Sequence, residues 1–219
     1  TILDNAFNLN ISSNMLSAMS DLFISLSGTE LKADQVNLYD FSGYVLEAGI
    51  STIVKKTDGS KDEWIAVARD LEGKKVLTPP YCTREYTKTA TYDQWFISLY
   101  RSFNNQYKRG VGVIETAKQC KSVFKSIITY KKKNHEDAAS IYVFDSNGDL
   151  IYPYDISQEY KAALQPYYEL TKGDDSALTF ISPLTGKTEY AAEAVSSYTG
   201  YTYLTIQPES VVLAPVYNL

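Results

Sequence analysis

The clearest alternation of side chains in this sequence lies between Trp95 and Phe103 and predicts a β-strand. Its two faces are Phe96, Ser98, Tyr100 and Ser102 on one side, and Ile97, Leu99, Arg101 and Phe103 on the other. A polar turn over 104–106 and a second strand ending at Glu115 follow. Apolar residues then recur at helical spacing from Ala117 to Ile128. We therefore expect a hairpin that leads directly into an amphipathic helix.

The N-terminal segment also has helical spacing. Its apolar residues are three or four positions apart: Leu3, Phe7, Ile11, Met15, Met19, Leu22 and Leu26. This stripe predicts one long helix before Ser27–Thr29, or two shorter helices broken near Ser12–Asn14. A long helix of this kind is a candidate seam for a homodimer.

The next part of the chain gives weaker signals. We expect a helix over Leu31–Ile53, interrupted by Gly43 and Gly49, and then a strand over Glu63–Asp70. A turn over 72–74 would join this strand to a short partner at Lys75–Leu77, which Pro79 ends. A polar, tyrosine-rich loop over Tyr81–Tyr92 follows.

The second half of the chain predicts a further sheet. Strands over Ile141–Asp145 and Leu150–Tyr152 flank an Asn147–Gly148 turn, which tolerates positive φ. Ser157 is placed to cap a helix that extends to about Leu170, although Pro166 should kink or divide it. The remaining elements are strands over 177–182, 188–195 and 201–206, and a helix that starts at Pro208.

These elements predict an α+β protein with a long N-terminal helix and two antiparallel-sheet modules. The expected parts are a helix over 1–29, a sheet module over 30–116, a linking helix over 117–135, a second sheet module over 136–207 and a C-terminal segment over 208–219. The chain starts without Met and within a helical pattern, so we expect it to be a fragment of a longer protein.

Composition removes several function classes. The net charge of −5 argues against nucleic-acid binding, because phosphate neutralisation needs a basic surface, and the run Lys131–Lys133 fits a helix end. No apolar run reaches the roughly 18 residues of a membrane span. With His135 as the one histidine, a zinc site and a Ser-His-Asp triad both lack parts, and we expect no cofactor or metal. A disulfide between Cys82 and Cys120 stays open.

Several segments resemble double Cache domains, the extracytoplasmic sensor domains of bacterial membrane histidine kinases and chemoreceptors. The segment Trp95–Phe103 with Arg109–Glu115 is similar to the family's hydrophobic-Ser-x-x-Arg strand and the strand after it. Ile141–Tyr152 resembles the membrane-proximal hairpin, and Thr199–Pro208 the closing strand. The resemblance implies two PAS-like modules, membrane-distal and membrane-proximal, with both chain ends near the membrane through flanking helices absent from this sequence.

The resemblance also implies a small-molecule site in the distal module. Arg101 could pair a ligand carboxylate, or it could form an ion pair with Glu115 or Asp70, or face outward. The further candidates are Tyr81, Arg84 and Tyr86 in the loop over the pocket, Trp64, Trp95 and Tyr100 in its walls, and Glu115. For each aromatic residue a place in the core is the alternative. The family's amino-acid-binding pattern, Tyr…Arg-x-Trp…Tyr…Asp, cannot be laid onto this chain.

The function expected from these observations is ligand sensing by the extracytoplasmic part of a histidine kinase, without enzyme activity in this fragment. A chemoreceptor sensor domain is the alternative within the same family. A carbohydrate-binding or adhesion module, which would need no membrane helices, is a second alternative. An enzyme would need a pair such as Asp70 and Glu115 in one cleft.

Overall fold

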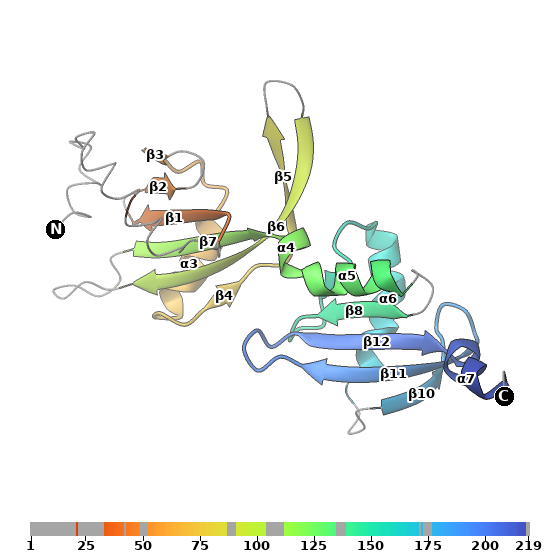
Figure 1. Ribbon diagram of the computed structural model, residues 1–219. Helices are drawn as coiled ribbons and strands as arrows, with labels where there is room; N and C mark the ends of the chain where they lie inside the picture. The colour runs from red at the N-terminus through yellow and green to blue at the C-terminus, as the bar shows by residue number, and fades with distance from the viewer. Residues whose placement is uncertain are drawn as a thin grey trace. The chain divides into compact units, whose positions relative to one another are not determined.

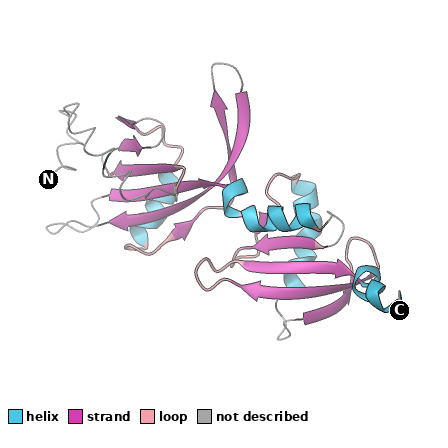
Figure 2. Ribbon diagram, viewed as in Figure 1, coloured by secondary structure: helices cyan, strands magenta, loops and turns pink. Residues whose placement is uncertain are grey.

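The computed structural model describes residue 21 and residues 33–41, 43–48, 52–86, 91–103, 112–134, 139–170, 172 and 177–217. The long N-terminal helix expected over 1–29 falls outside these ranges except for Asp21, and so does the turn expected over 104–106. The chain divides into two compact units, Thr1–Gln119 and Cys120–Leu219. Each unit contains one antiparallel sheet; helix α3 packs on the first, and several helices accompany the second (Figures 1 and 2).

The first unit contains a seven-stranded sheet with the order β3-β2-β1-β7-β6-β4, and β5 also pairs with β6. Its strands are β1 (Gln35–Asp40), β2 (Tyr44–Ala48), β3 (Thr52–Lys56), β4 (Val76–Leu77), β5 (Tyr81–Tyr86), β6 (Thr91–Phe103) and β7 (Gly112–Gln119). The strand predicted from Trp95 to Phe103 is confirmed and lies inside β6. Its predicted faces also hold, since Ser98, Tyr100 and Ser102 are buried while Arg101 is exposed.

The helix expected over Leu31–Ile53 is wrong, because this region forms the meander β1-β2-β3. Gly43 has a φ of +92° in the turn between β1 and β2, a conformation that glycine adopts without the cost that a Cβ brings. Within β1 the residue types alternate: the polar or amphipathic Asn37 and Tyr39 lie on one face, and the apolar Val36 and Leu38 lie on the other. This period of two is the signal that the helical interpretation overlooked.

The strand expected over Glu63–Asp70 is also wrong, because the segment forms helix α3 (Asp62–Asp70). Two acidic residues in its first turn and Arg69 in its last turn suit the helix dipole. Its apolar side chains pack on one face of the sheet in a core of Tyr39, Val45, Ala68, Val76, Tyr100 and Val113, with Trp64 and Ile65 beside it. The apolar run is therefore the buried stripe of a short helix, which a short window cannot distinguish from a strand.

Two further boundaries differ from the expectation. The region from Tyr81 begins as strand β5, which pairs with β6 through Cys82↔Trp95 and Arg84↔Asp93 and is not a loop. Strand β7 runs on to Gln119, so Ala117 pairs with Ser98 inside the sheet and does not begin the helix. Pairing with β1 and β6 on both sides extends the strand beyond what its own sequence indicates.

The second unit begins with α4 (Cys120–Val123) and α5 (Lys125–Lys133). Its five-stranded sheet has the order β10-β11-β12-β8-β9. The remaining elements are β8 (Ser140–Phe144), β9 (Leu150–Tyr152), α6 (Gln158–Leu170), β10 (Ala177–Ile181), β11 (Thr188–Val195), β12 (Thr202–Pro208) and α7 (Glu209–Tyr217). The strands predicted for this half are confirmed to within two residues at each end. Helix α6 continues through Pro166, so the expectation that this residue could divide the helix is wrong.

Local hydrogen bonds explain why the turn and the helix start in this half could be predicted from the sequence. Gly148 has a φ of +90° in the β8–β9 turn, and Asp145 Oδ1 accepts bonds from the backbone N–H groups of Asn147 (2.8 Å) and Asp149 (2.9 Å). Ser157 Oγ accepts a bond from the N–H of Tyr160 at 3.2 Å, which confirms it as the cap of α6. Turn and cap are therefore fixed by neighbours in sequence.

Two buried residues of α6, Leu164 and Tyr167, join the core of the second sheet. The other members of this core are Tyr142, Phe144, Leu150, Ala191, Leu204 and Ile206. No helix in the described ranges is long and apolar enough to cross a membrane. Cys82 is exposed on β5, whereas Cys120 is fully buried at the start of α4. The disulfide considered for these two residues stays a prediction.

Candidate functional site

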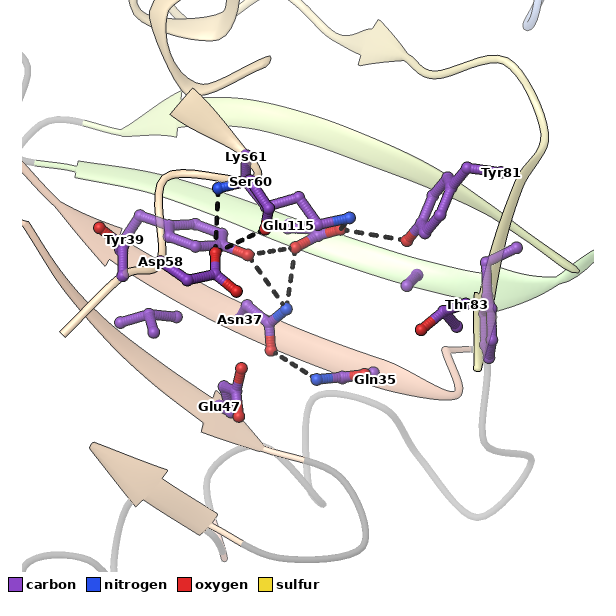
Figure 3. A pocket seen from close by; sticks show the side chains of 14 residues that line it. Gln35, Asn37, Tyr39, Glu47, Asp58, Ser60, Lys61, Tyr81, Thr83 and Glu115 are labelled. Carbon is purple, nitrogen blue, oxygen red and sulfur yellow. Dashed lines mark hydrogen bonds and ion pairs between the residues drawn. The ribbon is translucent and has the colours of Figure 1, made fainter. Parts of the chain in front are cut away.

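A cavity of about 210 Å³ lies on the sheet of the first unit, on the same face as α3. Tyr39 and Val45 belong both to the cavity wall and to the core under α3. The cavity is lined by Gln35, Asn37, Tyr39, Val45, Glu47, Thr57, Asp58, Ser60, Lys61, Tyr81, Thr83, Phe96, Glu115 and Ala117. Strands β1, β2, β5, β6 and β7 and the segment before α3 therefore contribute to it (Figure 3).

Glu115 is at the centre of the polar lining (Figure 3). Its side chain is only 1% exposed, yet neutral donors surround the carboxylate. Oε2 accepts hydrogen bonds from Asn37 Nδ2 (2.8 Å) and the Tyr39 hydroxyl (2.5 Å). Oε1 accepts one from Ser98 Oγ (2.6 Å), and the Tyr81 hydroxyl oxygen lies 3.5 Å from Oε1. A buried carboxylate is tolerated when its lone pairs are satisfied in this way.

The net effect of these contacts is to keep Glu115 ionised. Burial alone raises its pKa, but hydrogen bonds from Ser98, Tyr39 and Asn37 and the charge of Lys61 outweigh burial and lower the pKa below its ordinary value of 4.5. The same negative charge, together with burial, raises the pKa of Tyr39 far above its usual range. Tyr39 is therefore a fixed donor to the carboxylate at neutral pH.

The donors are themselves held by a chain of hydrogen bonds. Gln35 Nε2 donates to Asn37 Oδ1 at 3.1 Å, which leaves the Asn37 amide group directed at Glu115. The Tyr81 hydroxyl lies 2.7 Å from Ser98 Oγ and donates to it, because the Ser98 hydroxyl already gives its proton to Glu115. Since Gln35 and Asn37 come from β1, Tyr81 from β5 and Ser98 from β6, three strands converge on one carboxylate of β7.

Lys61 is the cation of the lining. Its Nζ lies 3.9 Å from Glu115 Oε1 and 4.0 Å from the centroid of the Tyr81 ring. Its side chain is 28% exposed. Just before it, Asp58 Oδ1 accepts bonds from the N–H (2.9 Å) and hydroxyl (2.6 Å) of Ser60, which shapes the turn into α3.

The cavity lining has more negative than positive charge. Glu47, Asp58 and Glu115 contribute carboxylates, and Lys61 contributes the one ammonium among the residues of the lining. The remaining polar groups of the lining are side-chain amides and hydroxyls. In the described ranges, no three His, Cys, Asp or Glu side chains come together in a group that could hold a metal ion.

An aromatic stack supports the cavity from the core. Tyr100 stacks against Tyr39 with ring centroids 6.4 Å apart, and against Trp64 on α3 at 6.5 Å. The Tyr100 hydroxyl is buried and has no hydrogen-bond partner among the described residues. Burial and the charge of Glu115 raise the pKa of Tyr100 well above its usual range. The stack links the cavity wall to the helix.

The structure brings only part of the predicted site together. Tyr81 and Glu115 line the cavity, and Trp64 and Tyr100 belong to the core beside it. Arg101 is exposed and donates from Nε to the carbonyl oxygen of Gly73 at 2.7 Å, so it holds the turn after α3 and does not line the cavity. It has the outward-facing place that the sequence left open as an alternative.

Three other candidates lie elsewhere. Trp95 is next to Phe96 in β6 and so points to the opposite face, away from the cavity lining. Arg84 and Tyr86 lie on β5 by their backbone pairing with Asp93 and Thr91, and their side chains are outside the described part of the structure.

The sequence analysis missed most of the lining, in particular Asn37, Tyr39, Asp58 and Lys61. The first two were hidden because their strand was taken for a helix. The available signal was the alternation of Gln35, Asn37 and Tyr39, three polar or amphipathic groups on one face of a strand. No local signal marks Lys61, because only the packing of α3 brings it next to Glu115.

No family model matches the chain, and no curated protein matches it. Solved structures do. The ligand-binding domain of the Campylobacter jejuni chemoreceptor Tlp3 with L-norvaline matches with a TM-score of 0.61 and 16% identity, over 95% of this chain and 78% of that chain. The ligand-binding domain of the Pseudomonas aeruginosa amino acid chemoreceptor PctB with L-Arg matches with a TM-score of 0.64 and 12% identity, over 96% and 78%.

The extracellular domain of rpHK1S-Z16, described as a histidine kinase, also matches, with a TM-score of 0.60 and 17% identity over 97% of this chain and 84% of that chain. These likenesses extend over almost the whole sequence. They show that the chain has the fold of such sensory domains, which confirms the α+β, PAS-like architecture expected from its motifs.

Proposed function

We propose that this chain is the extracytoplasmic sensor domain of a bacterial membrane signalling protein and that it binds a small molecule in the cavity around Glu115. The observation that carries the proposal is the cavity itself: a hollow with a pre-oriented, ionised carboxylate, in a chain that shares its fold with ligand-binding sensor domains. Such cavities with a few fixed polar groups are the usual form of small-molecule sites.

The size of the cavity limits the ligand. A volume of about 210 Å³ is smaller than the roughly 300–1,000 Å³ of pockets that bind drug-sized ligands. The ligands of the structural relatives, isoleucine, L-valine, L-norvaline and L-Arg, are of this small class. The proposal is therefore a metabolite of amino-acid size or smaller, although the family's amino-acid pattern is not present in this chain.

Signalling would follow from a ligand-biased shift between two arrangements of the domain, which requires a different affinity for each. A histidine kinase and a chemoreceptor are both supported as the full-length protein, because both kinds occur among the structural relatives. In either, the flanking helices would connect the first unit's site to a cytoplasmic output. Dimerisation through residues 1–29 stays a prediction, which light scattering of the chain checks.

Calorimetric melting of the chain against a library of amines, amino acids, organic acids and sugars tests the proposal. A ligand at 100 times its Kd should add about 2.7 kcal/mol of stability. Thr83→Trp fills the cavity from β5, and Cys82→Trp is a matched control on the neighbouring position that does not line it. A shift lost in the first variant and kept in the second supports the proposal. No shift from any compound, or equal shifts in both variants, contradicts it.

A further inference from the structure

We propose that the ligand carries a protonated amino group, and that this group takes the place that the Lys61 ammonium holds in the structure. The inference rests on the proposed function, because it assigns a chemical class to the ligand of the same cavity. It also assigns Lys61 a role that the fold alone does not require: a tethered cation that competes with the ligand.

The first argument is the surroundings of Lys61 Nζ. A carboxylate oxygen at 3.9 Å and an aromatic face at 4.0 Å from the ring centroid are the two groups that recognise an ammonium ion. The distance to Glu115 is longer than a charge-assisted hydrogen bond of about 2.8 Å, so the lysine occupies the position without making its best contact. A free amine could approach Oε1 more closely.

The second argument is charge. With Lys61 in place the lining has three carboxylates against one ammonium. An anionic ligand that bound to Lys61 would also face Glu47, Asp58 and Glu115 in a small cavity, and these like charges would repel it. A cationic ligand meets no such repulsion once the lysine has moved away. The balance therefore favours amines over carboxylic acids.

The third argument is that Lys61 can leave. Its side chain is 28% exposed and long, so the ammonium can turn to water while the stem stays near the protein surface. Glu115 keeps its position when Lys61 leaves, because Ser98, Tyr39 and Asn37 still donate hydrogen bonds to the carboxylate. The carboxylate therefore remains positioned for the incoming amine.

Displacement of Lys61 also connects binding to the fold. Lys61 directly precedes α3, whose Trp64 and Ala68 pack on the sheet next to Tyr39 and Tyr100. A state with Lys61 in the cavity and a state with it outside differ in affinity for an amine, which is the condition for a ligand to shift a conformational equilibrium. The start of α3 is therefore the element that the ligand would bias.

Three four-carbon probes of similar length test the inference by titration calorimetry: 1,4-diaminobutane, 1,4-butanediol and succinate. We expect the diamine to bind, and the diol and succinate to bind at least about tenfold more weakly. Lys61→Met removes the charge and keeps the apolar stem, and we expect it to tighten diamine binding by about tenfold, or about 1.4 kcal/mol. Lys74→Met, at an exposed lysine after α3, is the matched control and should leave the Kd unchanged.

Lys61→Gln provides a second charge-free variant in case the methionine variant folds poorly. Succinate binding that either Lys61 variant abolishes would make Lys61 an anion anchor and overturn the inference, while the proposed function would stand. The inference would also be overturned, and the proposed function would stand, if every library compound whose binding Thr83→Trp abolishes were neutral or anionic. If neither the three probes nor any library compound binds in a Thr83→Trp-sensitive way, the proposed function fails together with the inference.

Discussion

Asn37 and Glu115 lie directly opposite each other in the antiparallel pairing of β1 with β7, and Asn37 Nδ2 donates a 2.8 Å hydrogen bond to Glu115 Oε2. The two residues are 78 positions apart in the chain. A shift of one residue in this register would turn one of the two side chains to the other face of the sheet. The centre of the candidate site therefore depends on strand pairing.

Glu115→Gln should destabilise the first unit by about 2 kcal/mol, because the amide presents an N–H₂ to groups that now donate to a carboxylate. Trp64 and Trp95 are the two tryptophans of the chain and both lie in this unit, so their fluorescence during urea unfolding reports its stability. Glu63→Gln, at an exposed position on α3, is the control and should change little. A loss below about 0.5 kcal/mol for Glu115→Gln would contradict the hydrogen-bond network.

The pH dependence of the unfolding free energy should also report the hydrogen bonds to the ionised Glu115 carboxylate. Because the folded-state pKa of Glu115 is lowered, its contribution is complete above the unfolded value, near 4.5, and is lost as the pH falls through the folded value. The difference in unfolding free energy between the wild type and Glu115→Gln should thus be constant from pH 7 to about pH 5 and shrink below pH 4.5. A difference that grows on acidification would mean that the pKa is raised.

The two thiols should react very differently with a thiol reagent such as Ellman's reagent. Cys82 is exposed, whereas Cys120 is fully buried and burial raises its pKa to about 12. We expect one thiol per chain to react in the native protein and two after unfolding in denaturant without reductant. No reactive thiol in the unfolded, unreduced protein would instead mean that the two cysteines are bonded.

Gly112→Ala should destabilise the first unit by more than 2 kcal/mol. A Cβ at this position would collide with the backbone oxygen of Tyr39 and with the Phe103 ring, and overpacking of this kind costs about 1–3 kcal/mol before any backbone shift. Gly43→Ala is a useful comparison, because its Cβ would meet nothing within 4 Å and only its φ of +92° is unfavourable, at about 1–2 kcal/mol. Equal losses of stability in the two variants would contradict the close packing of Gly112 against Tyr39 and Phe103.

Elements fixed by neighbours in sequence could be predicted here. The β8–β9 turn at Asn147–Gly148, the Ser157 cap of α6 and the alternating strand at Trp95–Phe103 all depend on contacts within a few residues. The region before Trp95 could not be predicted in this way. The apolar run of α3 fits either a strand or a helix, and only its place on the sheet selects the helix.

The candidate site shows the same division. The sequence identified Glu115 and Tyr81 as polar and aromatic groups next to predicted strands, but it favoured Arg101, which the alternation of β6 turns outward. The sequence analysis did not identify Asn37 or Lys61, because no residue near either of them in the sequence indicates a contact with Glu115.

The sequence by itself determined the α+β class, the two sheet modules and the second unit's strands, because turns, caps and alternation are local properties of the chain. The tertiary structure alone decided that β1, β2, β5, β6 and β7 line one cavity, that its carboxylate stays ionised, and that Lys61 lies against this carboxylate. These features depend on register and on the docking of α3, which join residues far apart in the chain. The charge of Glu115 therefore depends on the hydrogen-bond donors and the lysine that folding places around it.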